Sequence, residues 1–145
     1  MLLDALGNWE AVTVEQETQI TFETPFYAAL NINIKNGYSM KGGYTTKAAK
    51  VAIGDIAWSC QKAVTEAGLQ GKWQARKFYV DIMIHKPRLY AGDPTNFQKP
   101  IVDAVAPVLG VNDRLCAAST DWRDIGDGEK ARFEITVRQE EGEDG

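Results

Sequence analysis

Histidine and cysteine are scarce in this chain, which has one histidine, His85, and two cysteines, Cys60 and Cys116, among 145 residues. The cysteines lie far apart and form no Cys-x-x-Cys pair or Cys/His cluster, which argues against a zinc site or a redox pair. We therefore expect two reduced thiols in or near the core of a cytoplasmic protein. We expect a structural role for His85, which ends an apolar run.

Long apolar runs are also missing. No stretch approaches the roughly 18 to 20 residues that cross a membrane, so we expect no membrane partner. The opening segment, MLLDALGNWEAV, contains acidic residues and no long apolar run, which is unlike a signal peptide. Hydrophobic residues make up 44% of the chain and charged residues 25%, which is typical of one soluble globular domain over residues 1–145.

The net charge is only −4, but it is unevenly distributed. Residues 36–100 hold ten Lys and Arg against four Asp and Glu, whereas both flanking segments are acidic. A basic centre of this kind fits a face that binds a polyanion such as DNA. Uneven surface charge without any function is the simpler explanation when charge is considered alone.

The N-terminal part predicts an arm, a strand and a hairpin. Residues 1–16 lack a clear pattern and suggest a loosely held arm. Alternating apolar and polar side chains predict a strand over residues 18–23, which Pro25 ends. An Asn-Gly pair inside an alternating run predicts a hairpin over residues 31–40.

Two helices and one confident strand follow. Apolar residues at three- and four-residue steps predict a helix that begins at Thr45 or Thr46 and stops at Gly68. A run rich in strand-forming residues predicts a strand over residues 78–85, with Phe78, Val80, Ile82 and Ile84 on one face. Asp-Pro at 93–94 is typical of a helix start, and this second helix is expected to reach about Val108, with Gly110 as its stop.

The C-terminal part predicts two more strands, over residues 115–123 and 131–138, joined across Gly126-Asp127-Gly128. Residues 139–145 are acidic and rich in glycine, so we expect a disordered tail. The whole order predicts an α/β (α+β) sandwich, in which two main helices pack on a mixed β-sheet.

The segment from Asp93 to Asp113 concentrates the chemistry. In a helix, Asn96, Lys99 and Asp103 share one face, and short loops can bring Asp93 and Asp113 to the same end of the sheet. Converging carboxylates with no histidine or cysteine nearby favour Mg²⁺ or Mn²⁺, and a lysine beside them suits a phosphate substrate. Each residue also has a simpler interpretation: Asp93 as a helix cap, Lys99 and Asp103 as a solvated pair, and Asp113 as a turn residue.

The stretch Asp93-Pro-Thr-Asn96-Phe-Gln-Lys99-Pro-Ile-Val-Asp103-Ala-Val, followed by Asn112-Asp113, resembles the RusA-like Holliday-junction resolvases. Their pattern runs D-x-D-N-x-x-K-x-x-x-D-A-L, and an Asp-Asp pair then enters a strand. His85-Lys86-Pro87-Arg88 resembles the strand end before the family motif, and Thr46-Lys47-Ala48-Ala49-Lys50 resembles a family helix start. The similarity covers most of residues 17–138.

The resemblance implies a homodimeric endonuclease that binds branched DNA, such as a four-way junction, and cuts it with Mg²⁺ or Mn²⁺. It makes Asp93, Lys99 and Asp113 the catalytic residues and Asp93, Asp103 and Asp113 the metal ligands. Tyr38, Tyr44 and Trp73 are candidates for stacking on unpaired bases, with core positions as the alternative. The candidate DNA-binding residues are Lys47, Lys50, Lys72, Arg76, Lys77, Lys86, Arg88 and Asn96.

Two positions depart from the family pattern. Thr95 stands at the second motif aspartate and Asn112 at the first residue of the later acidic pair, if one residue is deleted from the preceding turn. Without that gap, Asp113 matches the first acid and Arg114 the second. Neutral oxygen ligands weaken cation binding, so the alternative function is a weakened or inactive protein that binds branched DNA without cutting it.

Overall fold

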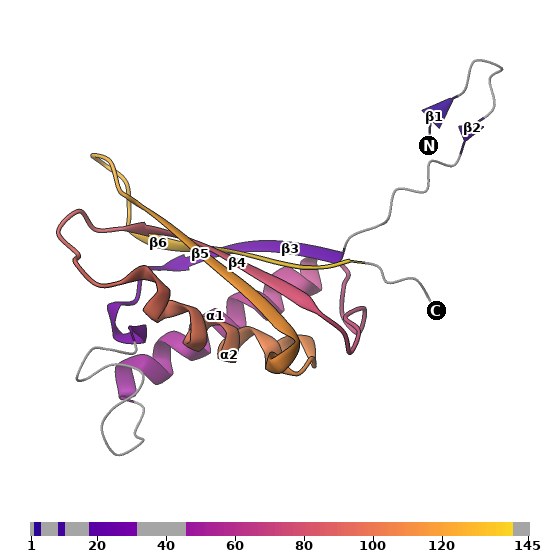
Figure 1. Ribbon diagram of the computed structural model, residues 1–145, viewed down its shortest axis with the longest axis horizontal. Coiled ribbons are helices and arrows are strands. Elements are labelled where there is room, and N and C mark those ends of the chain that lie inside the picture. Colours follow the sequence, from indigo (N-terminus) through magenta and orange to yellow (C-terminus); the bar gives the residue numbers. More distant parts are fainter. Residues whose placement is uncertain (1, 4–8, 11–17, 32–45, 141–145) are drawn as a thin grey trace.

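The computed structural model describes residues 2–3, 9–10, 18–31 and 46–140 (Figure 1). Within the expected N-terminal arm, β1 (Leu2–Leu3) pairs antiparallel with β2 (Trp9–Glu10). The rest of that arm, nearly all of the predicted hairpin and residues 141–145 of the predicted tail lie outside the described residues.

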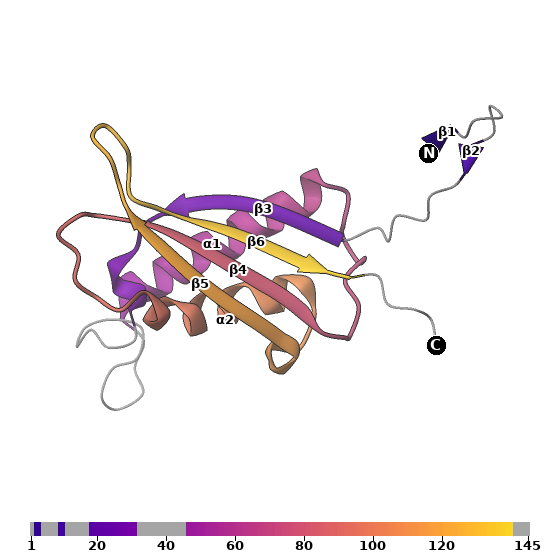
Figure 2. The same ribbon diagram turned by 45° about the horizontal axis from the view of Figure 1, so that its top comes forward.

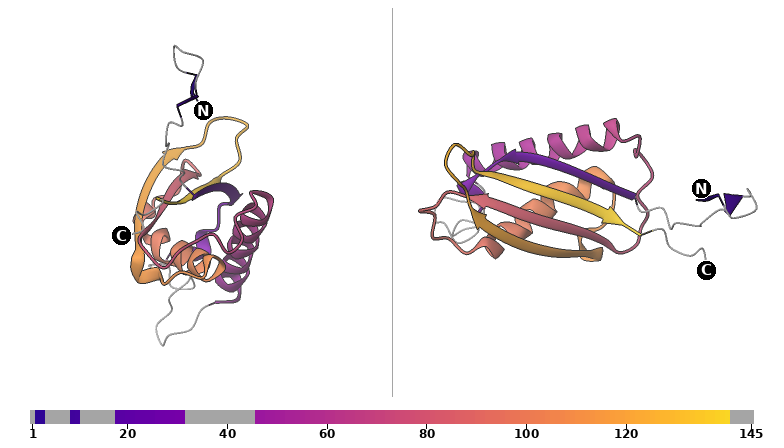
Figure 3. Two further views of the ribbon diagram at one scale, coloured as in Figure 1. Left: turned by 90° about the vertical axis from the view of Figure 1, so that its right-hand side faces the viewer. Right: turned by 90° about the horizontal axis from the view of Figure 1, so that it is seen from above.

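Four strands form one mixed sheet with the spatial order β3-β6-β4-β5 (Figure 2). The central strand β6 runs antiparallel to both of its neighbours, whereas β4 and β5 are parallel. Both helices cover the same face of this sheet (Figure 3), which confirms the predicted sandwich. The bounds are β3 (Thr18–Pro25), α1 (Lys47–Glu66), β4 (Phe78–Lys86), α2 (Gln98–Leu109), β5 (Cys116–Asp124) and β6 (Arg132–Gln139).

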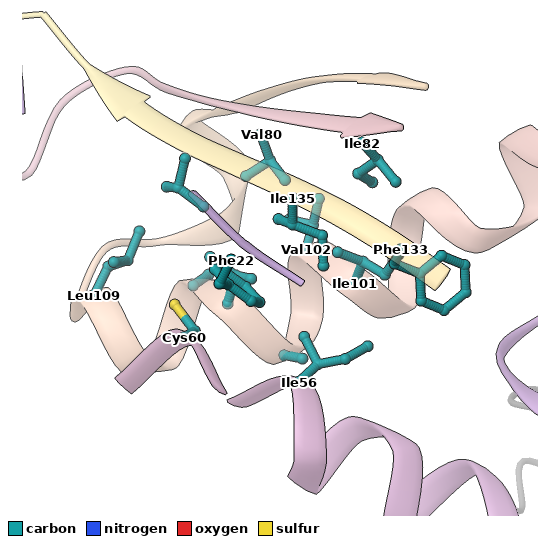
Figure 4. Close-up of a cluster of buried hydrophobic side chains, with 14 of the residues drawn as sticks. Phe22, Ile56, Cys60, Val80, Ile82, Ile101, Val102, Leu109, Phe133 and Ile135 are labelled. Atoms are coloured by element: carbon teal, nitrogen blue, oxygen red, sulfur yellow. The ribbon is translucent and has the colours of Figure 1, made fainter. Parts of the chain in front are cut away.

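The core lies between the sheet and the two helices (Figure 4). Strand side chains alternate between the two faces, and the four apolar residues predicted to share a face of β4 are all buried: Phe78, Val80, Ile82 and Ile84. Helix α1 contributes Ile56 and Cys60, and burial raises the pKa of the Cys60 thiol to about 12. The expectation of a reduced thiol in the core is therefore confirmed for Cys60.

Helix α1 begins where the sequence predicts. Thr46 caps it, because the Thr46 side chain accepts a hydrogen bond of 3.1 Å from the backbone N–H of Ala49. The chain leaves the helix through Gly68, whose φ of 69° lies in the left-handed region that glycine adopts without a steric penalty.

Two predicted boundaries are wrong. The sequence predicts that the first strand stops at Glu23, before Pro25, but β3 includes Pro25 as its last residue, which is tolerated because β3 is an edge strand and proline lacks only the N–H. Gln139 is not part of the tail, since it ends β6 and is only 1% exposed. Its side chain reaches the loop before β4, where it hydrogen-bonds to the backbone of Gln74 and Arg76.

A helical connection joins the parallel strands β4 and β5 and contains the segment from Asp93 to Asp113. It leaves β4, passes through the 3-10 helix η2 (Pro94–Phe97) and α2, and enters β5 through a second 3-10 helix, η3 (Asp113–Leu115). Within residues 18–31 and 46–140, no helix combines the length and the apolar character needed to cross a membrane.

Candidate functional site

An aromatic cluster fixes the start of the site. Phe97, the last residue of η2, is 1% exposed, and its ring centroid lies 5.4 Å from that of Phe26 and 5.3 Å from that of Phe133. Tyr90, in the preceding loop, packs against the rings of Phe26 and Phe97. Buried aromatic rings at these separations hold one another in place, so η2 is anchored on the sheet although it is a single turn.

Asp93 caps η2. Its Oδ1 atom accepts hydrogen bonds from the backbone N–H of Thr95, at 3.0 Å, and from the Thr95 hydroxyl, at 2.8 Å. The backbone bond, followed by the hydroxyl bond, holds the pKa of the exposed Asp93 carboxyl below its ordinary value of 3.8. The simpler interpretation of Asp93 as a helix cap therefore describes its geometry.

Lys99 and Asp103 pair on the exposed side of α2. The Lys99 Nζ atom lies 3.0 Å from Asp103 Oδ2, in the i,i+4 arrangement that favours oppositely charged residues on a helix. The Lys99 side chain is 66% exposed, whereas that of Asp103 is only 23% exposed. Asp103 is thus the more enclosed partner, and Lys99 keeps access to an incoming anion.

The turn after α2 returns the chain toward the helix. Gly110 ends α2 with a φ of 70°, a left-handed conformation that suits glycine. The Asn112 side chain then caps η3 by accepting a 2.9 Å hydrogen bond from the backbone N–H of Arg114. Asp113 is the first residue of η3, the short 3-10 turn that precedes β5, so the simpler interpretation of Asp113 as a turn residue describes its position.

These elements line an open pocket of about 350 Å³ between α2 and β5. A second hollow of about 490 Å³ shares two of its residues, so Asp103 and Asp113 lie in the wall between the two hollows. The pocket unites residues from both parts of the motif, because α2 supplies Lys99 and Asp103 and η3 supplies Asp113. Its lining residues are Thr95, Gln98, Lys99, Val102, Asp103, Asp113, Cys116 and Ala118.

Of the three predicted metal ligands, two line the pocket. Asp93 is not among its lining residues, and no group of three or more His, Cys, Asp or Glu suited to a metal ion occurs in the part of the chain that the structure describes. Burial raises the pKa of the Cys116 thiol to about 11, so this pocket residue is protonated at neutral pH and supplies no thiolate. The pocket therefore offers hard oxygen donors.

That donor set fits one class of ion. Mg²⁺ commonly binds through one or two carboxylates, keeps several waters and takes further oxygens from substrate phosphates. Asp103 and Asp113 match this pattern, with the Thr95 hydroxyl as a neutral oxygen at the same pocket. The three predicted ligands, Asp93, Asp103 and Asp113, do not all lie around one pocket and so do not together surround an ion.

The candidate DNA-binding residues do not gather around the pocket, since none of the eight lines it. Lys47 and Lys50 lie in the first turn of α1, which is 20 residues or roughly 30 Å long, and Lys72, Arg76 and Lys77 follow its far end. All of these are exposed except Arg76, which is half-buried, as is Asn96 in η2.

The remaining two candidates are engaged elsewhere. Arg88 is exposed, with its guanidinium 3.2 Å from the Asp127 carboxylate. Lys86 is 9% exposed; its Nζ atom lies 2.6 Å from Asp124 and donates a 3.0 Å hydrogen bond to the Tyr90 carbonyl. Lys86 is therefore committed to the fold rather than open to a DNA backbone.

Sequence reasoning missed several residues at this site. Gln98 and Val102 line the pocket beside Lys99 and Asp103, one position before each, and a full reading of that helix face would have included them. His85 is buried, with its Nε2 3.0 Å from Glu134, and it does not line the pocket. Of the stacking candidates, Trp73 is buried, whereas Tyr38 and Tyr44 lie outside the described residues.

No family model matches this chain, and no curated protein sequence matches it. Among solved structures, it is similar to Plasmodium falciparum IspF in a CDP complex, with 14% sequence identity and a TM-score of 0.34. The match covers 67% of this chain and 58% of that chain, so this chain spans less than two thirds of that protein's length. A likeness of this size carries no argument about function.

Proposed function

We propose that this protein is a Mg²⁺- or Mn²⁺-dependent endonuclease of the RusA-like kind, which cuts branched DNA such as four-way junctions in recombination and repair. One observation carries the proposal: Lys99 and Asp103 from α2 and Asp113 from η3, which leads into β5, line a single pocket. Lys99 and Asp103 share a face of α2 because they are four residues apart, so the supporting fact is that Asp113, ten residues after Asp103, lines the same pocket.

Each residue has a role that follows from its chemistry. Asp103 and Asp113 would hold the ion, which when bound would supply activation of a water molecule and shielding of the leaving oxygen. Lys99 would bind a nonbridging phosphate oxygen and neutralise charge that develops there. Because Lys99 is paired with Asp103, its move to a phosphate would remove one positive charge from beside the Asp103 carboxylate. Binding of DNA and of the ion would then favour each other.

The test uses a synthetic four-way junction with Mg²⁺ or Mn²⁺. We expect cleavage by the unmodified protein and its loss in Asp113→Asn and Asp103→Asn, with junction binding retained. Asp127→Asn serves as a matched control, because the Asp127 side chain is 98% exposed and is absent from both hollows. Cleavage that persists in both pocket variants would remove this pocket from the reaction.

A second candidate function is binding of branched DNA without cleavage. It is favoured by the way Asp93 and Asp103 are satisfied without an ion, the first by Thr95 and the second by Lys99. This candidate predicts junction binding that weakens steeply with salt and no product with any divalent ion. Cleavage at the rate of an active resolvase would exclude it.

The proposal includes a homodimer in the cytoplasm. A four-way junction offers paired strands to cut, and a two-fold dimer presents two identical sites to them. Light scattering on the purified protein, with and without junction DNA, measures the oligomeric state directly. A monomer in both conditions would contradict this part of the proposal.

A further inference from the structure

Trp122 is a large aromatic side chain left exposed at the edge of the sheet. It lies on β5, the last strand in the order, and is 51% exposed. Its partner in β4 is Ile84, a core residue, so Trp122 points toward the helix-covered face of the sheet. An indole in this position is directed to the same side as the pocket.

A continuous row of β5 side chains connects Trp122 with the pocket. Cys116 and Ala118 line the pocket, and the Thr120 hydroxyl donates a 2.8 Å hydrogen bond to the side-chain oxygen of Gln98, another lining residue. Trp122 follows two positions later on the same face of the strand. At about 3.3 Å per residue, Trp122 lies roughly 13 Å along β5 from Ala118.

Lys86 supports the ring from one side. Its Nζ atom lies 5.3 Å from the centroid of the Trp122 ring, and Asp124 and the Tyr90 carbonyl hold the ammonium there. Because Lys86 is only 9% exposed, the cation lies on the protein side of the indole. Its attraction to the π-system orients the ring, so the opposite ring face is presented to solvent at little further entropic cost.

We propose that Trp122 is a stacking site for an unpaired nucleobase of the DNA strand whose phosphate lies in the pocket. The proposal rests on the proposed function and specifies the DNA structure that it recognises. Ala118 is the pocket residue nearest to Trp122 on β5, so the roughly 13 Å between them reaches the edge of the pocket and corresponds to about four nucleotides at roughly 3.4 Å per nucleotide of a stacked strand. An unpaired base at this separation would mark a branch point and set the distance from branch to cut.

The surroundings favour a base over an apolar protein partner. On the same face of β5, the nearest neighbours of Trp122 along the strand are Thr120 and Asp124, both polar. A protein-binding surface would need a contiguous apolar patch, whereas a single base needs one aromatic face and tolerates polar groups around it.

Binding of two fluorescently labelled probes tests the proposal: a fork with two single-stranded thymidine arms, and a fully paired duplex of the same length. Removing a stacking ring weakens binding by about fivefold to 150-fold per base. We therefore expect Trp122→Ala to weaken fork binding by at least fivefold, with duplex binding changed less than twofold. Trp122→Phe should restore most of the fork affinity, because it keeps an aromatic face.

Trp58→Ala is the matched control, since Trp58 is 67% exposed but lies on α1. Thermal unfolding of each variant checks the fold. Equal losses for fork and duplex, or an unchanged fork affinity in Trp122→Ala, would overturn the stacking site and leave the proposed function standing. Failure of the unmodified protein to bind either probe would overturn both proposals.

Discussion

Thr95 donates two hydrogen bonds to one carboxylate oxygen of Asp93, one from its backbone N–H at 3.0 Å and one from its hydroxyl at 2.8 Å. In the family pattern that this segment resembles, position 95 is an aspartate, which has no hydroxyl proton to donate and would repel Asp93 unless a cation lay between them. The threonine thus stabilises the charge on Asp93 in the absence of a metal ion. The threonine at position 95, where the resembled pattern has aspartate, therefore bears directly on whether this site can bind a metal ion.

The Asp93–Thr95 contact predicts a measurable change in acid titration. Thr95→Val keeps the shape of the side chain but removes the hydroxyl, so the pKa of Asp93 should rise toward its ordinary value of 3.8, while the remaining backbone bond keeps it partly lowered. Carboxyl carbon NMR across pH 2 to 6 would follow it directly. An unchanged pKa in Thr95→Val would mean that the hydroxyl does not contact Asp93 in solution.

The same contact predicts a pH-dependent contribution to stability. A carboxyl whose pKa is lower in the folded than in the unfolded chain stabilises the fold above its unfolded value, and this contribution disappears as the pH falls through the folded value. The free energies of unfolding of the unmodified protein and Thr95→Val should therefore differ more at pH 6 than at pH 2. Urea unfolding at the two pH values measures the difference.

Restoring a carboxylate at position 95 should strengthen ion binding. Thr95→Asp removes the hydroxyl donor from Asp93 and adds a charged oxygen at a pocket that Asp103 and Asp113 already line. We expect a lower Tm without metal, a larger Tm increase on adding MnCl₂ and faster junction cleavage than for the unmodified protein. Thr95→Ala, which removes the hydroxyl without adding charge, is the control and should show no larger Mn²⁺ response. No gain in Thr95→Asp would show that position 95 lies away from the ion.

The sequence was most informative where one local rule determined the structure. Alternation from Phe78 to Ile84 predicted the face of β4, and the capping preference of threonine predicted the start of α1 at Thr46. Prediction from the sequence failed where contacts with residues far away in the chain determined the local structure. Gln139 looks like part of a polar tail until the backbone of Gln74 and Arg76, far away in the chain, gives its amide three partners.

The candidate site was predictable in location but not in detail. Motif spacing brought out Lys99, Asp103 and Asp113, and these residues do line one pocket. Spacing could not reveal that Lys86 is enclosed by Asp124 and the Tyr90 carbonyl, because Asp124 lies opposite Lys86 on the neighbouring strand β5 and Tyr90 lies in the loop that follows β4. For the same reason a count of basic residues overstates the surface open to DNA.

The salt dependence of DNA binding should separate open from enclosed lysines. Each lysine that contacts a phosphate adds about 0.9 to the slope of log K against log salt concentration. Lys50 is exposed on α1, so under the proposed function Lys50→Met should lower the slope by about 0.9. Lys86→Met should leave the slope unchanged, because Lys86 is buried and paired with Asp124. Equal slope changes in the two variants, measured by anisotropy at four salt concentrations, would contradict this distinction.

Gln139 should contribute to stability as a core residue does. It is 1% exposed; its Oε1 accepts from the backbone N–H of Gln74 at 2.7 Å, and its Nε2 donates to the carbonyls of Gln74 and Arg76 at 2.8 and 3.0 Å. At about 1 kcal/mol per hydrogen bond, Gln139→Ala should lower the free energy of unfolding by about 3 kcal/mol. Glu140→Ala, at the exposed neighbouring position, should change it by no more than about 0.5 kcal/mol. Urea unfolding of both variants decides the matter, since a truly disordered tail beginning at residue 139 would make the two substitutions equally harmless.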